Sequence, residues 1–159
     1  MKKLNFPTAV GSLLSIVLLT LTIMSCKTEP KNSEKAAEKT QMQAVMGVHD
    51  AVMPKMGAIG RLVKELGQEK DSLLAISPVD QNGIATLEQG IDSLKAGHKQ
   101  MMDWMKDFGA QFTAEEILKG KALSAAKKEA LAIEAVKVAN MEAAINGSIE
   151  NAENLLEKF

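Results

Sequence analysis

Apolar side chains recur at helical spacing over three long stretches of the chain, residues 33–76, 82–108 and 113–158. In the second stretch the apolar residues follow one another at alternating steps of three and four, which places them on one face of an α-helix. Its members are Ile84, Leu87, Ile91, Leu94, His98, Met101, Met105, Phe108 and Phe112. No stretch alternates apolar and polar residues in the manner of a strand. The pattern predicts an all-α fold, an up-down-up three-helix bundle whose first and third helices are long.

The first and third stretches carry apolar stripes at steps of seven residues, as helices packed side by side do. In the first stretch the stripe is Val45, Val52, Ile59 and Leu66, and in the third it is Leu131, Val138, Ile145 and Ala152. A second seam of the first stretch is rich in sulfur: Met42, Met46, His49, Met53 and Met56. These stripes predict the faces that the helices bury.

Proline, glycine and capping residues predict where the helices bend and end. Pro54 removes a backbone hydrogen bond, so a kink or break is expected there. Ser77-Pro78 closes the first stretch, and Gly109 is well placed to stop the second. The third begins at Thr113, which can cap a helix whose Glu116 reaches back to form a capping box.

The N-terminus resembles a bacterial lipoprotein signal. Two lysines precede an apolar run that is too short for a comfortable membrane span. Ile23-Met24-Ser25-Cys26 then resembles a lipobox, which implies that Cys26 is lipidated and becomes the first mature residue. The expected organisation is a signal peptide over residues 1–25, the lipidated Cys and a flexible tether over 26–33, and the helical bundle over 34–159. Lys27, where inner-membrane lipoproteins carry Asp, implies the outer membrane.

Charge and motif content exclude several functions. Residues 26–159 carry 17 Lys and Arg against 20 Asp and Glu, a net charge of about −3, and no basic face predicts nucleic-acid binding. Cys26 is the only Cys, so an intramolecular disulfide or thiolate metal site is excluded. The chain has two His, no nucleophile relay and no phosphate-binding loop, and the carboxylates fall on polar faces. We therefore predict a protein that is not an enzyme.

The stretch "HKQMMDWMKDF" suggests one chemical activity, the binding of a soft metal ion. Thioether and imidazole groups suit Cu(I) and Ag(I), and an indole ring can cap such an ion. Antiparallel pairing of the first two helices places Met56 near Asp103 and His49 near Ala110. The candidate ligands to Cu(I) are His49, Met53, Met56, Met102, Met105 and His98, with Trp104 as the cap.

The same residues have a structural interpretation that remains open. Met fills irregular space in a core, as beside a proline kink, and Trp104 would flank that core with its N–H toward water. Haem ligation is disfavoured, because a three-helix core is tight and no attachment motif is present. No other cofactor is expected.

The segments "VHDAVMPKM" and "MMDWMKDF" resemble a group of small helical bacterial lipoproteins labelled "viral A-type inclusion protein". The matching residues are His49, Asp50, Met53, Pro54 and Met56 in the first segment, and Met101, Met102, Asp103, Trp104 and Met105 in the second. His98 does not match the group, whose members more often have an acidic or small residue near that position. The resemblance implies a lipid-anchored helical bundle with no established activity. We therefore expect a cell-envelope interaction module with another envelope protein as its partner, and periplasmic Cu(I) or Ag(I) binding as the alternative.

Overall fold

The computed structural model describes residues 30–76 and 78–159, so the predicted signal peptide and Cys26 lie outside the described residues. The described elements are α1 (Pro30–Val52), the 3₁₀ helix η1 (Met53–Lys55), α2 (Met56–Leu74), α3 (Gln81–Gln111), α4 (Ala114–Lys119) and α5 (Ala125–Lys158). These ranges contain no strand, which confirms the all-α prediction. None of their helices is both long and apolar enough to cross a membrane. The helices are more numerous than the three expected, because two predicted helices are divided.

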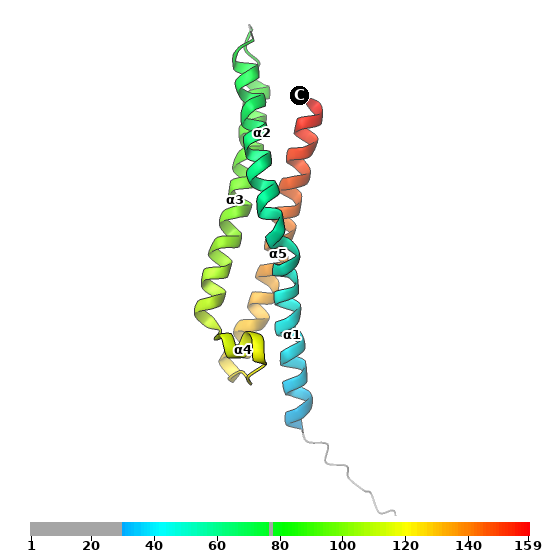
Figure 1. Cartoon of the computed structure of the whole chain (residues 1–159), viewed down its shortest axis with the longest axis vertical. Coiled ribbons are helices and arrows are strands. Elements are labelled where there is room, and N and C mark those ends of the chain that lie inside the picture. The colour runs from blue at the N-terminus through cyan, green and yellow to red at the C-terminus, as the bar shows by residue number, and fades with distance from the viewer. Residues whose placement is uncertain (1–29, 77) are drawn as a thin grey trace, which may run out of the picture.

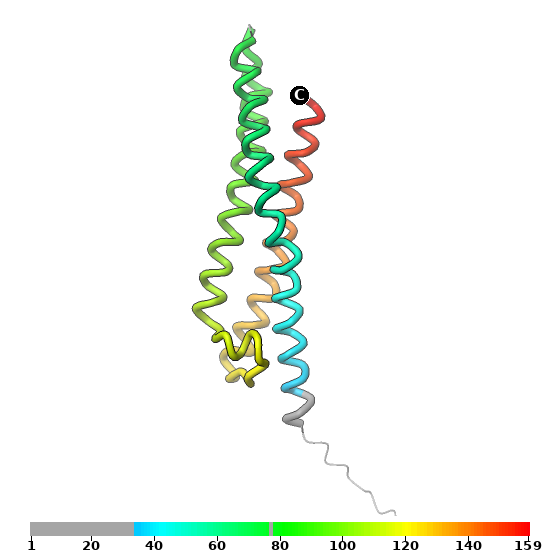
Figure 2. Tube along the Cα trace, in the orientation of Figure 1, coloured from blue at the N-terminus to red at the C-terminus, as the bar shows by residue number. Residues whose placement is uncertain are grey.

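The helices form an elongated molecule (Figure 1). The chain runs upward through α1 and α2, returns downward along α3, crosses the lower end as α4 and runs upward again as α5 (Figures 1 and 2). Helix α3 packs against both α2 and α5, and α5 also packs against α1 and α2. The α2–α3 turn therefore lies at one end of the molecule, and the start of α1 lies near the other.

The predicted break at Pro54 takes the form of η1, a single 3₁₀ turn between α1 and α2. Proline is tolerated there because it occupies the first turn of η1, where its missing N–H is not needed. The same preference acts at Pro30, the first residue of α1. Helix therefore begins inside the segment 26–33 that was expected to be tether.

The predicted third helix is divided at Gly120. Thr113 and Glu116 form the expected capping box at the start of α4, which is confirmed. Gly120 then adopts a left-handed conformation with φ of 64° and ends α4 after six residues. Ser124 caps α5 by accepting a hydrogen bond from the Lys127 backbone N–H. A non-glycine residue would be strained at Gly120, so the break is encoded locally.

The predicted stop at Gly109 is wrong, because α3 continues through it to Gln111. Phe108 and Phe112 lie one turn apart on either side of Gly109, and both are buried. Burying two aromatic rings outweighs the cost of about 1 kcal/mol for one glycine within a helix.

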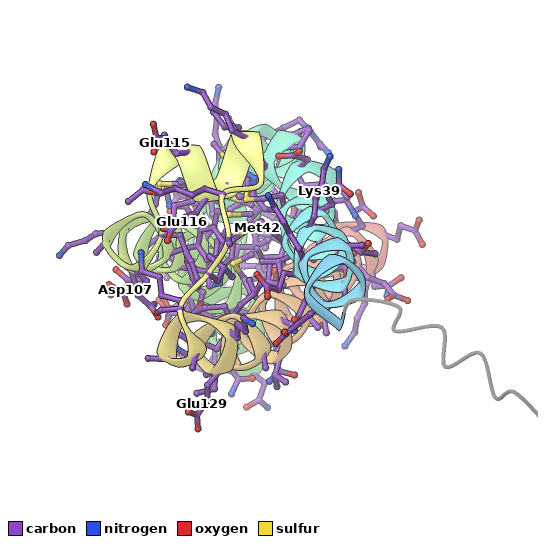
Figure 3. All side chains as sticks on the ribbon, turned by 90° about the horizontal axis from the view of Figure 1, so that it is seen from below. Lys39, Met42, Asp107, Glu115, Glu116 and Glu129 are labelled. Carbon is purple, nitrogen blue, oxygen red and sulfur yellow. The ribbon has the colours of Figure 1, made fainter. Side chains whose placement is uncertain are left out.

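The core confirms the heptad stripes of the first and third stretches, all of whose members are buried. The sulfur-rich seam of α1 flanks this core. Met42 is buried and points into the middle of the molecule (Figure 3), whereas Met46 and Met56 are half-buried. Burial of the aliphatic stripe therefore positions α1 and α2, and most of the sulfur lies beside it.

A second stripe on α3, made of glycines, was not anticipated. Gly83, Gly90 and Gly97 repeat at steps of seven and are buried. A Cβ at Gly90 would lie 2.7 Å from Leu155 Cδ1 on α5, and one at Gly97 would lie 3.3 Å from Ile145 Cγ1. The missing side chains therefore let α3 approach α5 closely in the upper half of the molecule.

Candidate functional site

The residue that follows these glycines at the same heptad position is Trp104. Its ring is stacked on Phe108, with centroids 4.7 Å apart, and Phe108 packs on Phe112 at 4.8 Å. Three large rings thus occupy the lower half of the molecule, where glycines are absent from this position. Trp104 therefore places a large ring at the heptad position where Gly90 and Gly97 have no side chain.

His49 of α1 packs against this aromatic column. Its imidazole is stacked on Trp104 with centroids 5.6 Å apart, six residues before the Ala110 that the predicted pairing placed beside it. His49 Nδ1 is 2.9 Å from Asp50 Oδ1. The neighbouring carboxylate orients the ring and leaves Nε2 as the other nitrogen available to a ligand.

The remaining metal candidates are spread over different environments. Met56, Met102 and Met105 are half-buried and pack against the core. Met53 is 38% exposed on η1, and His98 is exposed on α3. The structure therefore brings His49 and Trp104 together, but it leaves His98 and Met53 on the surface.

The expected seam of α3 is wrong at His98, which is exposed, whereas Met105 is half-buried against the core. After Leu94, the buried positions are Gly97, Met101, Trp104 and Phe108. Because α3 packs against two helices, its buried face widens on the side of Gly97 and Trp104 and leaves His98 in solvent. Trp104 is therefore part of the core, whereas the structural interpretation of the sequence had it flanking the core with its N–H toward water.

A groove with a volume of about 430 Å³ lies between α3 and α5 beside Trp104. Helix α3 contributes Gln100, Asp103, Trp104 and Asp107, and α5 contributes Glu134, Lys137, Asn140, Met141 and Ala144. These residues are spaced at three, four and seven along each helix, so two facing stripes form the walls. Pockets of about 300–1,000 Å³ are typical of small-molecule sites.

Glu134 is the most buried charged residue of the described chain, with 1% of its surface exposed. Its Oε1 accepts hydrogen bonds from Lys137 Nζ at 2.8 Å and from Gln111 Nε2 at 3.0 Å. This hydrogen bond to Glu134, together with the charges of Glu134 and Asp107, raises the pKa of Lys137. Glu134 Oε2 and Trp104 Nε1 have no hydrogen-bond partner among the described residues.

Sequence reasoning found Trp104 but missed Glu134 and the rest of the groove. Glu134 was assigned to a solvated face because a lone carboxylate on a helix carries no local signal of burial. The glycine repeat was the available signal, since Trp104 follows Gly83, Gly90 and Gly97 at the same heptad position and is buried with them. No group of three or more His, Cys, Asp or Glu residues able to hold a metal ion occurs in ranges 30–76 and 78–159.

Comparison with protein-family models, with curated proteins and with solved structures finds no match to this chain. The resemblance to helical lipoproteins therefore stays a prediction, and function has to be argued from the residues themselves.

Proposed function

We propose that this protein is a non-enzymatic lipoprotein of the cell envelope, held in the outer membrane by lipid on Cys26. Its α1–α2 segment, α3 and α5 act as the three legs of an up-down-up helical module that binds another envelope protein. The lipobox-like N-terminus and the resemblance to helical lipoproteins support the location. The all-α fold supports the role of an interaction module.

The observation that carries the interaction is the apolar tip of the α2–α3 hairpin. Leu74 is 51% exposed, Ile76 is 59% exposed and Val79 is 38% exposed. This tip lies at the opposite end of the molecule from the start of α1 (Figure 1). At 1.5 Å per residue, α1 to α2 spans about 65 Å, so a domain anchored through its N-terminus would present the tip far from the lipid.

Site-specific photo-crosslinking in cells tests the tip as the contact surface. A photoreactive residue at Ile76 should give a discrete product with another envelope protein, and the product should disappear with Leu74→Ser and Val79→Ser. The control places the photoreactive residue at Lys64, an exposed position on α2. Equal labelling from Ile76 and Lys64, or none from either, would remove the tip from the proposal.

Binding of Cu(I) or Ag(I) is the second candidate, and it is favoured by His49. The imidazole is oriented by Asp50 and lies against Trp104, as a soft-metal site with an indole cap requires. Met56, Met102 and Met105 are the half-buried thioether candidates. Surface exposure of Met53 and His98 makes these two the weaker members of the predicted ligand set.

A Cu(I) titration against a competing chelator, followed by Trp104 fluorescence, tests this candidate. We expect His49→Asn to abolish stoichiometric binding and Met56→Leu with Met102→Leu to weaken it at least tenfold. His98→Asn is the matched control and should bind as the parent does. Loss of binding only in His98→Asn, or tight binding by all variants, would show that the proposed ligands are wrong.

A further inference from the structure

Helix α5 has a second row of regularly spaced residues on the side that does not face the core. The buried row, which includes Leu131, Val138 and Ile145, follows steps of three and four. An outer row follows the same steps and is exposed throughout. Its members are Glu129, Ile133, Val136, Asn140, Ala143, Gly147, Glu150 and Asn154. Glu129, at one end of the row, points away from the molecule (Figure 3). Helix α5 therefore carries two heptad seams, and the structure packs one of them.

The outer row lacks the charges that usually cover an exposed helix. Ile133 is 53% exposed and Val136 is 62% exposed. Nine residues of α5 are exposed between the two glutamates of this row, and Lys137 is the one charged residue among them. A stretch of α3 of equal length, residues 88–107, exposes seven charged residues. A helix that is apolar on both sides is usually buried on both, so the outer row indicates a contact surface.

The order of residues in the outer row fits pairing with an identical helix in the parallel direction. If Ile133 takes position a of a heptad, Asn140 and Gly147 also take a, and Val136 and Ala143 take d. A β-branched residue and an asparagine at a are features of parallel two-stranded coiled coils. Each Asn140 amide has both donors and an acceptor, so two of them can hydrogen-bond across the seam and fix its register.

The charges beside the outer row also fit a second copy of the chain. In a parallel pair, Lys137 of each copy lies beside Ala132 of the other. Lys137 is already paired with the buried Glu134 of its own helix at 2.8 Å. No like charges therefore meet over the uncharged layers of the row. The two glutamates of the row meet their counterparts just outside these layers, and their repulsion limits the pairing to the segment between them.

The size of the outer row predicts a weak, reversible pair. From Glu129 to Asn154 the row is about 38 Å long, and a helix with its side chains is about 12 Å across. Two such faces bury at most about 900 Å² in total, below the range of about 1,200–2,000 Å² for stable complexes. We therefore expect a dimer with a Kd of about 10–100 µM.

We propose that two copies of this protein pair in parallel through the outer row of α5, in register at Asn140. Both copies use the same row, so the contact closes as a two-fold dimer. Parallel pairing keeps the starts of both α1 helices at the same end, as two copies anchored in one membrane require. The α2–α3 tip takes no part, so the pairing goes beyond the proposed contact with another envelope protein and does not depend on it.

Added cysteines test the pairing and its direction. Ile133→Cys, Asn140→Cys and Gly147→Cys are made in the full chain, purified in a polyoxyethylene detergent and treated with a short bismaleimide. In a parallel pair each position lies beside its own counterpart, so all three variants should give a covalent dimer. The parent measures any linkage through Cys26, and Lys64→Cys, exposed on α2, is the control position. Linkage through Asn140→Cys alone would indicate an antiparallel pair and overturn the proposal, as would equal linkage from Lys64→Cys.

Variants with opposite expected effects separate the pairing from folding. Val136→Glu should raise the Kd at least tenfold, because it places two acids in the seam, and Asn140→Val should lower it at least threefold, because it removes a polar layer. Both positions are exposed in one copy, so the helix content should not change. Ala85→Glu, at an exposed position of α3, should pair as the parent does. Sedimentation equilibrium in density-matched detergent measures the Kd.

The direction of these changes decides the proposal. A Kd that rises in Val136→Glu and falls in Asn140→Val supports it. A parent that stays monomeric at about 500 µM, or an unchanged Kd in both variants, would overturn it. Loss of pairing in Leu74→Ser rather than in Val136→Glu would also overturn it, since the contact would then lie at the α2–α3 tip.

Discussion

At the scale of single residues, one heptad position of α3 changes from glycine to tryptophan along the helix. At Gly90 and Gly97 an added Cβ would lie close to the side chains of Leu155 and Ile145 of α5, which would have to shift. Trp104 then occupies the same position and lines the groove. Along this one position, glycine therefore allows close contact with side chains of α5, and tryptophan contributes a buried aromatic ring.

Gly97→Leu should destabilise the protein by about 1–2 kcal/mol, because the cost of overpacking exceeds the gain in helix propensity. A Cβ at Gly97 would already lie 3.6 Å from the backbone Cα of Ile145. The longer side chain must therefore displace α5. Urea unfolding followed by circular dichroism measures the change in the free energy of unfolding.

Gly60→Leu is the matched control for this prediction. Gly60 lies inside α2 with no atom within 4 Å of its added Cβ. The substitution should therefore stabilise the protein by about 0.5–1 kcal/mol through helix propensity alone. If Gly97→Leu is as stable as Gly60→Leu, close packing at the glycine stripe is refuted.

At the scale of elements, the short helix α4 is held by one buried carboxylate. Glu116 Oε2 accepts hydrogen bonds from Lys127 Nζ at 2.6 Å and from the Thr113 backbone N–H at 2.8 Å. The hydrogen bond from Lys127, followed by that from Thr113, lowers the pKa of Glu116 to about 2. Glu116 therefore ties the N-terminus of α4 to the first turn of α5.

The lowered pKa predicts that Glu116 stabilises the fold in a pH-dependent way. Its folded-state pKa of about 2 lies below the ordinary value of 4.5. The stabilisation is therefore present above about pH 4.5 and is lost as the pH falls toward 2. Relative to the parent, Glu116→Gln should be least stable at pH 7 and approach the parent near pH 2.

Urea unfolding at pH 7, 4 and 2.5 measures this difference. Lys127→Met gives an independent check, because it removes the ammonium while Glu116 remains, and it should reduce the loss of stability on acidification. A constant gap between the parent and Glu116→Gln from pH 7 to 2.5 would show that the ion pair contributes nothing to folding.

The all-α fold and the apolar stripes of the first and third stretches were predictable from sequence. The end of α3 and the part of its buried face near His98 were not. The capping box at Thr113 and the break at Pro54 are local features, and both occur as predicted. The stop at Gly109 failed because burial of Phe108 and Phe112 overrides local preference. Exposure of His98 depends on which two helices cover α3, and no local pattern encodes that arrangement.

At the scale of the whole molecule, we propose different roles for its two ends: anchoring at the end where α1 begins, and contact with a partner at the α2–α3 tip. The chain enters α1 near the lower end, and the exposed residues Leu74, Ile76 and Val79 lie at the opposite end (Figure 1). The groove with Trp104 and Glu134 lies between α3 and α5, nearer to α4. The proposed contact surface therefore lies at the opposite end of the described chain from the start of α1, and the groove lies between the two.

The candidate site was only partly accessible from sequence because it depends on the register between distant helices. His49 and Trp104 belong to the predicted metal cluster, and the structure places them together. Glu134 lies 30 residues after Trp104 in the chain. It lines the same groove from α5 and accepts a hydrogen bond from Gln111 of α3, so its burial depends on the antiparallel pairing of α3 and α5.

The central claim, attachment to a membrane through lipid on Cys26, is tested most directly by detergent-phase partitioning of the full chain expressed in a bacterium. The parent should enter the detergent phase and carry acyl chains on the peptide that begins at Cys26, detected by mass spectrometry. Cys26→Ser should remain in the aqueous phase, with the helix content of the bundle unchanged. Aqueous partitioning of the parent, or equal partitioning of parent and Cys26→Ser, would contradict the proposed lipoprotein.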